Sequence, residues 1–315
     1  MKLVEQNMTQ QLNNQILSRF GLNKMKDSEI MTDNSKNMEY SLDDETFENL
    51  RDIIYKNYGI YFNSNKKYLL VTRLGKILRE RNIYDFQSYI KLLISSNLKH
   101  ELKMLADSVT INETYFFRAK EQLEALEKSI VREIFNSKTG FQKNSFRIWS
   151  AACSSGEEPY TMAMLIKEKL QPQYPGARFQ VVASDINSAV LKKARAGIYN
   201  YYAVKDVPPQ YLMKYFEKKG SYFYIKDEIK RMVSFSSVNL YDQSQMKMQK
   251  NYDVIFCANV LIYFDLKSKR KVLEMLHNSL NPGGYLFVGF SESLHGVSDK
   301  FKMIHYPKAI VYKKK

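Results

Sequence analysis

The sequence has no apolar run as long as a membrane span, and its first residues, Met1–Gln6, lack the apolar block of a signal peptide. Cysteine is scarce: Cys153 and Cys257 are the two in the whole chain, and each lies in or next to a predicted buried strand. This usage argues against a disulfide framework and against a zinc cluster. We therefore expect a cytoplasmic protein.

Histidine is also scarce, and the chain lacks any Ser-His-Asp, Cys-His or metal-ligand constellation. The four histidines are expected to be incidental: His100, His277, His295 and His305. We expect no metal, and no chemistry that depends on such a constellation.

Hydrophobic residues make up 44% of the chain and aromatic residues 13%, which is ordinary for a globular protein, and 315 residues suffice for two domains with cores. Lys and Arg outnumber Asp and Glu by 48 to 33, which gives a net charge of +15. This excess indicates an acidic partner, either nucleic acid, a membrane surface or a carboxylate-rich protein. Charge alone does not rank these.

Two segments are predicted to be parallel strands that each end near an acidic residue. The first strand, Ile148–Ala152, stops at small residues, and Pro159 then opens an amphipathic helix. The turn at Ser154–Gly156 is expected to let a ligand approach the backbone. The second strand ends in Asp185, whose carboxylate is well placed to accept hydrogen bonds from ribose hydroxyls.

The glycine pattern distinguishes two nucleoside cofactors that fit these strands. A dinucleotide such as NAD requires G-x-G-x-x-G, but only Gly156 is present, and Glu157 and Glu158 stand where the phosphates would lie. Two carboxylates repel a phosphate and suit a sulfonium or amino group. The pattern therefore favours S-adenosylmethionine.

The distal part of the chain repeats the α/β pattern. It contains a buried strand at Tyr252–Cys257, a helix from about Leu266 to Leu280, and Asn281-Pro-Gly-Gly284 turning into a strand at Tyr285–Phe290. This order is typical of S-adenosylmethionine-dependent methyltransferases.

Six motifs occur in order along the chain. They are Asn112–Arg118 (NETYFFR), Ser150–Tyr160 (SAACSSGEEPY), Ala183–Ile186 (ASDI), Ser237–Leu240 (SVNL), Cys257–Asp265 (CANVLIYFD) and Leu280–Gly284 (LNPGG). Together they resemble the motifs of the CheR family, the chemotaxis receptor glutamate O-methyltransferases. Six motifs in the right order are far more specific than any one of them. The resemblance covers roughly residue 41 to the C-terminus.

The resemblance and the local patterns predict a Rossmann-like α/β methyltransferase domain of class I, preceded by an all-helical domain. Ser41 with Glu45 resembles the start of the first helix. Two β-rich runs, Tyr222–Ile225 and Arg231–Phe235, are expected to form a small antiparallel insertion. The predicted regions are a flexible extension at 1–40 with a short helix near Gln11–Phe20, a helical domain at 41–105, a linker at 106–145 with a helix near Lys120–Asn136, and the methyltransferase domain at 146–315 with its insertion at about 200–233.

The resemblance also implies which residues form the site. Arg118 and Tyr263 are expected beside the acceptor carboxylate, and Arg118 also beside the methionyl end of the cofactor. Residues expected to hold S-adenosylmethionine are Asn112, Thr114, Arg118, Glu157, Asp185, Asn239, Leu240, Asn259 and Val260. Many family members carry Arg where this chain has Ala258, so its rate or receptor preference could differ.

The expected partner is the acidic methylation region of a chemoreceptor. On the helix near Lys66–Arg81, Lys76 and Arg79 point away from the apolar face and Arg73 lies on its flank, so the helix offers either a solvated surface or a receptor contact. In the family, some members dock the receptor's C-terminal peptide on the small β insertion. We expect a monomer that binds no nucleic acid.

Competing interpretations are an enzyme that methylates nucleic acid or another acidic acceptor, and a cofactor-binding partner without turnover. Amino-adenine methyltransferases carry Asn/Asp-Pro-Pro-Tyr/Phe after the fourth strand, whereas here Asn259 precedes Val-Leu-Ile. Cytosine-C5 enzymes need a nucleophilic cysteine, and Cys257 lies in an apolar run. Methyl transfer to a glutamate needs no general base, because the carboxylate is already ionised at neutral pH.

Overall fold

The computed structural model describes residues 40–95, 98–140 and 144–315. The predicted extension at 1–40, with its expected helix near Gln11–Phe20, lies outside the described residues except for Tyr40. Among the described helices, none is long and apolar enough to cross a membrane.

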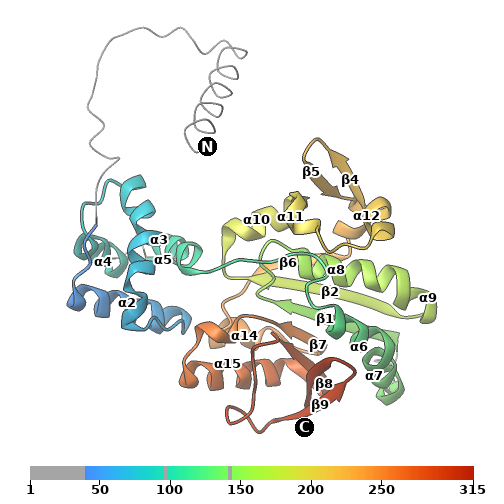
Figure 1. Ribbon diagram of the computed structural model, residues 1–315. Coiled ribbons are helices and arrows are strands. Elements are labelled where there is room, and N and C mark those ends of the chain that lie inside the picture. Colours follow the sequence, from blue (N-terminus) through green and yellow to red (C-terminus); the bar gives the residue numbers. More distant parts are fainter. Residues whose placement is uncertain (1–39, 96–97, 141–143) are drawn as a thin grey trace, which may run out of the picture. The chain divides into compact units, whose positions relative to one another are not determined.

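The predicted helical domain is confirmed (Figure 1). It consists of α2 (Asp44–Tyr58), the short turn η2 (Ser64–Lys66), α3 (Lys67–Glu80), α4 (Phe86–Ile94) and α5 (Leu98–Val109). The expected helix start at Ser41 was two residues early, because the Asp43 carboxylate accepts the backbone N–H of Thr46 at 2.8 Å and so caps α2. On α3 the apolar face is buried, as the periodicity predicts.

A seven-stranded sheet forms the α/β domain, with helices on both of its faces (Figure 1). The strand order is β6-β2-β1-β7-β8-β10-β9, and β10 alone runs antiparallel to the other six strands. This order confirms the predicted Rossmann-like domain. The strands are β1 (Ser145–Ala151), β2 (Arg178–Asp185), β6 (Val233–Ser237), β7 (Tyr252–Cys257), β8 (Leu280–Val288), β9 (Phe301–Tyr306) and β10 (Ala309–Lys314).

The chain reverses its direction across the sheet between β1 and β7, and open α/β sheets bind ligands outside the carboxyl ends of strands at such a point. The helices that follow the strands are α8 (Glu157–Leu165) with η5 (Ile166–Leu170) and α9 (Gln171–Gln173), α10 (Ser188–Ala196), α14 (Gln243–Lys247), and η6 (Leu261–Tyr263) with α15 (Leu266–Ser279). The linker helix is α6 (Lys120–Ala125), η3 (Leu126–Ile130) and α7 (Val131–Ser137).

The small antiparallel sheet exists, but one of its predicted strands was wrong. Arg231–Phe235 was expected to pair with Tyr222–Ile225, yet Val233–Ser237 is β6 and pairs in parallel with β2 of the main sheet. The strand β5 (Tyr222–Ile225) instead pairs with β3 (Ile198–Tyr199) and β4 (Phe216–Lys219). The short helices around this sheet are α11 (Tyr201–Val204), α12 (Pro209–Tyr215) and α13 (Asp227–Lys230).

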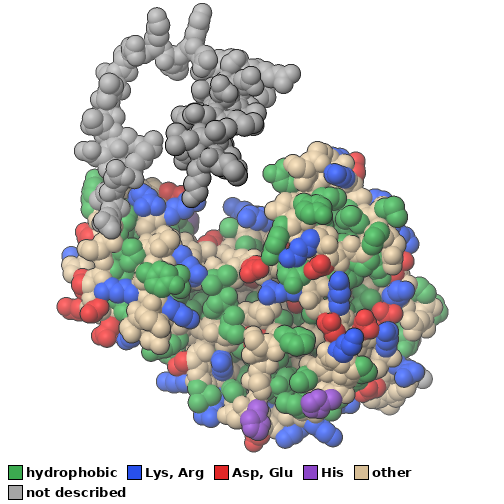
Figure 2. Space-filling model, in the orientation of Figure 1, with side chains coloured by type: hydrophobic (Ala, Val, Ile, Leu, Met, Phe, Trp, Pro, Cys, Tyr) green, Lys and Arg blue, Asp and Glu red, His purple; other side chains and the backbone are tan. Residues whose placement is uncertain are grey.

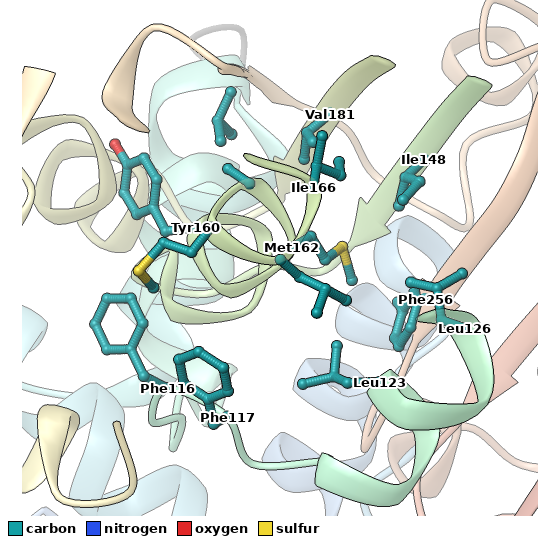
Figure 3. Packing of buried hydrophobic residues seen from close by; sticks show 14 of the residues in the cluster. Phe116, Phe117, Leu123, Leu126, Ile148, Tyr160, Met162, Ile166, Val181 and Phe256 are labelled. Atoms are coloured by element: carbon teal, nitrogen blue, oxygen red, sulfur yellow. The ribbon is translucent and has the colours of Figure 1, made fainter. Parts of the chain in front are cut away.

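Two clusters of buried side chains form the core of this domain. One extends from the linker across α8, and Figure 3 shows Phe116 and Phe117 of the linker near Tyr160 and Met162 of α8. In the other, the rings of Trp149 and Tyr252 stack with centroids 5.1 Å apart. The first cluster anchors the residues that lead into Arg118, so core packing positions part of the site.

Candidate active site

A cavity of about 540 Å³ lies where β1, β2 and β7 end. Its volume suits a cofactor of nucleoside size together with an acceptor side chain. Nine of the ten predicted site residues line it, namely Asn112, Thr114, Arg118, Asp185, Asn239, Leu240, Asn259, Val260 and Tyr263. Segments distant in sequence therefore meet at the carboxyl edge of the sheet, as the motifs led us to expect.

Glu157 is the predicted site residue that does not line the cavity, and its neighbour Glu158 lines it instead. The Glu157 carboxylate accepts a hydrogen bond from the Ser155 hydroxyl at 2.8 Å and is 3% exposed. Because α8 begins at Glu157, successive side chains point about 100° apart, and only the second acid faces the ligand space. The structure therefore places Glu158, and not the predicted Glu157, in the wall of the cavity.

Both acids have unusual proton affinities. Burial raises the pKa of Glu158 to about 7, against the hydrogen bond that its carboxylate accepts from the Ser150 hydroxyl at 2.6 Å and the charge of Arg118. Burial also raises the pKa of Glu157 to about 7. A cation beside Glu158 would favour its ionised form, so this position suits a ligand ammonium group.

Asp185 is held in place by two backbone groups. Its carboxylate oxygens accept the N–H groups of Ser154 and Asn187, each at 2.8 Å. Burial raises the pKa of Asp185, and these backbone hydrogen bonds oppose that rise. Each oxygen keeps lone pairs for a further donor, so the side chain can brace the turn after β1 and also accept ribose hydroxyls.

The turn after β1 has a strained backbone. Ala152 and Ser154 have φ angles of 64° and 50°, values that non-glycine residues seldom adopt. Gly156 has φ 95°, and a Cβ there would lie 3.0 Å from the Ala194 Cβ. This glycine allows close packing against α10, and Ser154 is the residue of the Ser154–Gly156 turn that lines the cavity.

The linker motif is tied to its surroundings by backbone hydrogen bonds. The carbonyl of Asn112 accepts the Ser154 hydroxyl at 3.1 Å, and the Phe116 N–H donates to the Ala203 carbonyl at 2.9 Å. Arg118 donates to the Glu113 carbonyl at 2.9 Å and keeps its side chain exposed at the cavity. This hydrogen bond orients the guanidinium, which forms no ion pair with a carboxylate in the described part of the chain.

Glu292 organises the loop after β7, and the sequence analysis missed it. Its carboxylate accepts the backbone N–H groups of Gly289 at 2.6 Å, Asn259 at 2.8 Å and Ile262 at 3.2 Å. Asn259 has a φ of 61°, so this acid stabilises a strained residue of the site. Gly289 directly follows β8, and a Cβ at this position would lie 2.6 Å from the Asn259 Oδ1. Only glycine therefore fits at this position.

Asn239 has a different set of contacts from the one expected. Its side chain donates to the carbonyl of Asn57 at 2.8 Å and accepts the N–H of Tyr241 at 3.0 Å. One amide hydrogen remains for a ligand. The side chain thus joins the loop after β6 to the end of α2, while Leu240 lines the cavity beside it.

The helical domain supplies part of the cavity wall through Tyr58, Ile60 and Val109. The N–H of Tyr61 donates to the carbonyl of Tyr263 at 3.0 Å, next to a β-bridge between Ile60 and Phe264. Burial raises the pKa of Tyr263, whereas the charges of Arg73 and Arg118 lower it. The predicted acceptor-side tyrosine is therefore held by the helical domain, a contact that no local pattern indicates.

The lining residues fit S-adenosylmethionine. Asp185 offers acceptors for a ribose, Glu158 offers a carboxylate for a cationic group, and Leu240 and Val260 contribute apolar surface. No cluster of three or more His, Cys, Asp or Glu able to hold a metal ion occurs within the described ranges.

Comparison with known proteins gives consistent matches. A family model described as "CheR methyltransferase, SAM binding domain" matches residues 112–310, and one described as "CheR methyltransferase, all-alpha domain" matches residues 45–110. Chemotaxis protein methyltransferase 2 of Vibrio cholerae is 37% identical over 278 residues, which cover 88% of this chain and 95% of that protein.

Two further relatives extend the similarity. Chemotaxis protein methyltransferase 1 of Pseudomonas aeruginosa is 37% identical over 273 residues, covering 85% of this chain and 97% of that protein. The chemotaxis protein methyltransferase of Escherichia coli is 34% identical over 267 residues, covering 84% of this chain and 89% of that protein. With both domains matched in order and a cavity suited to S-adenosylmethionine, this chain belongs to the CheR family of methyltransferases.

Proposed function

We propose that this CheR family member transfers the methyl group of S-adenosylmethionine to glutamate side chains of chemoreceptors, forming methyl esters. The observation that carries the proposal is that one cavity is lined both by the carboxylates of Glu158 and Asp185 and by Arg118 and Tyr263. The carboxylates suit a cationic cofactor, and the guanidinium with the tyrosine hydroxyl suits an anionic acceptor.

At the cofactor end, Asp185 accepts the ribose hydroxyls with the lone pairs that its two backbone donors leave free. Glu158 holds the methionyl ammonium group in place of the predicted Glu157. Asn112, Thr114, Asn259 and Val260 complete this part of the wall, and Leu240 with Asn239 borders the adenine.

At the acceptor end, Arg118 and Tyr263 orient the glutamate carboxylate. When bound, S-adenosylmethionine supplies a methyl group activated by its attachment to a sulfonium. The acceptor is already ionised at neutral pH, so the residues around it need only align it and exclude water. Ile262, Phe264 and Phe290 provide apolar surface for this exclusion, and Ala258 adds no charge.

The basic face of α3 is proposed to contact the receptor's methylation helices. Lys76 and Arg79 are exposed, and Lys76 lies 3.7 Å from Glu80. Arg73 donates a hydrogen bond to the carbonyl of Val109 at 2.8 Å, and its charge lowers the pKa of Tyr263 in the cavity wall. Arg73 therefore links this face to the cavity. An acidic helix lying along α3 would therefore approach the cavity at Arg73.

The small sheet is proposed to dock the receptor's C-terminal peptide. β4 is an edge strand in the order β3-β5-β4, and its residues Glu217, Lys218 and Lys219 are exposed. An exposed edge offers backbone groups to an added strand, and the lysines suit a peptide that ends in a carboxylate. A cytoplasmic location, expected from the two free buried cysteines, would place both surfaces beside the receptor's cytoplasmic part.

Nucleic-acid methylation has less support. Cys257 is fully buried, and burial raises the pKa of its thiol well above the usual value, so it is unsuited to act as a nucleophile. A methyltransferase for another acidic acceptor and a cofactor-binding protein without turnover are outcomes of the test below.

The test uses purified protein, radiolabelled S-adenosylmethionine and membranes that contain chemoreceptors, and measures label released by base as methanol. Wild type should form ester on receptor glutamates, whereas Asp185→Ala should lose cofactor binding and Arg118→Ala should lose transfer. Label on another protein would indicate a different acceptor. Cofactor binding without any ester would refute the enzyme and favour the sensor.

A further inference from the structure

A group of aromatic and cationic side chains lies beside the cavity, on the side of the linker and α11. We call it the tyrosine rim, defined as Tyr115, Arg118, Tyr202 and Lys205. The Lys205 ammonium lies 4.2 Å from the ring centroid of Tyr115 and 4.0 Å from that of Tyr202. The guanidinium of Arg118 lies 5.5 Å from the same Tyr115 ring. Two cations therefore share one aromatic side chain.

Ring packing and hydrogen bonds fix the side chains of the tyrosine rim in place. The two tyrosine rings meet edge to face with centroids 6.2 Å apart, and the Tyr202 hydroxyl donates to the Glu113 carboxylate at 3.0 Å. The hydrogen bond from the Phe116 N–H to the Ala203 carbonyl fixes the linker against α11. The two cation–π contacts hold Lys205 in position without an acidic partner.

The charges of the rim are free to bind an anion. Lys205 and Tyr202 are exposed, and no carboxylate pairs with Lys205 or Arg118 among the residues that the structure describes. Exposed apolar side chains continue from the rim over the small sheet, including Tyr201 at 75% and Tyr222 at 51% exposure. Figure 2 shows such hydrophobic side chains with Lys and Arg among them on this part of the surface. Aromatic residues and Arg together are characteristic of protein interfaces.

We propose that the tyrosine rim binds a second carboxylate of the receptor helix that presents the acceptor glutamate. This inference rests on the proposed function. Tyr115 and Arg118 line the cavity, whereas Tyr202 and Lys205 do not, so the rim leads from the acceptor position outward. Because Lys205 and Arg118 flank one ring, they are separated by no more than two helical turns, ~11 Å. An acidic helix can place its acceptor at Arg118 and a carboxylate one or two turns away at Lys205.

The rim would thus select among glutamates. A glutamate with an acidic neighbour at the correct spacing gains a charge-assisted contact to Lys205, and an isolated glutamate does not. Since Lys205 lies outside the cavity, it is expected to act on receptor recognition and not on cofactor affinity.

The experiment compares Lys205→Ala and Lys205→Glu with Lys271→Ala. Lys271 is a matched control, because its ammonium lies 3.7 Å from the Tyr241 ring centroid, it is exposed, and its removal changes the net charge equally. We expect KM for receptor to rise about two- to fivefold in Lys205→Ala, and further in Lys205→Glu through repulsion, with the dissociation constant for S-adenosylmethionine unchanged. Lys271→Ala should match wild type.

A second arm identifies the partner group. Receptor glutamates within two turns of the acceptor are replaced by Gln, and KM is measured with wild type and Lys205→Ala. The two enzymes should then give equal KM values, because the carboxylate that distinguishes them is gone. Equal KM values on the unmodified receptor, or an unchanged difference on the Gln receptor, would overturn the rim proposal. Absence of any receptor ester with wild type would instead overturn the proposed function.

Discussion

Exchanging Glu158 for Gln tests which of two adjacent acids holds the cofactor. Glu158 is half-buried and lines the cavity, whereas Glu157 is buried and does not line it; desolvation raises the pKa of each to about 7. A hydrogen bond to a charged group contributes about 1.5–3 kcal/mol, which is about a 10- to 150-fold change in affinity. Glu158→Gln should weaken S-adenosylmethionine binding by this factor, and Glu157→Gln should leave it within about threefold of wild type.

The pH dependence gives the same prediction a second readout. The ammonium of the cofactor pairs with the ionised carboxylate, so affinity should rise as pH increases toward the Glu158 pKa of about 7. Below that pKa, affinity should fall by up to about tenfold for each pH unit, because the deprotonated form binds more tightly, and the fall should level off at the loss expected for Glu158→Gln. Calorimetric titration from pH 5.5 to 7 should show this slope in wild type and Glu157→Gln, and no slope in Glu158→Gln. A slope lost in Glu157→Gln and kept in Glu158→Gln would refute the assignment.

Three other predictions concern residues around the cavity. Burial raises the Glu157 pKa from 4.5 to about 7, so the folded state keeps the Glu157 proton to a higher pH than the unfolded state does. The free energy of unfolding therefore falls as pH rises between these two values. Glu157→Gln should remove this fall, an effect of order 2–3 kcal/mol by pH 8, which urea unfolding at pH 5 and pH 8 measures. Glu292→Ala should lower kcat about tenfold or more, with partial recovery in Glu292→Gln, while exposed Glu274→Gln stays at the wild-type rate; equal losses in Ala and Gln variants would contradict a positioning role. Asn239→Ala removes the bond to the Asn57 carbonyl, about 1–2 kcal/mol, and should speed amide hydrogen exchange at Tyr61; unchanged exchange there would show that Asn239 does not secure this contact.

Sequence motifs that lie next to strand ends predicted residues that line the cavity. Asp185, Asn259 and the Asn112–Arg118 segment each follow or precede a recognisable element, and parallel strands carry their ends to one edge. The choice between Glu157 and Glu158 was not decided by any motif, since it depends on where α8 begins. The strand at Val233–Ser237 was misplaced because β-rich composition does not identify the pairing partner.

Glu292 shows most clearly what a sequence pattern leaves out. Its role depends on three backbone N–H groups, and backbone donors carry no residue identity. Asn259, Ala152 and Ser154 line the cavity with positive φ angles, so the site stores backbone strain on two neighbouring strand ends. Glu292 braces the first of these and Asp185 the turn that holds the other two. In the proposed site the Asp185 carboxylate serves both the fold and the ligand, so replacing it should raise the cofactor dissociation constant by more than the lost ribose contact alone.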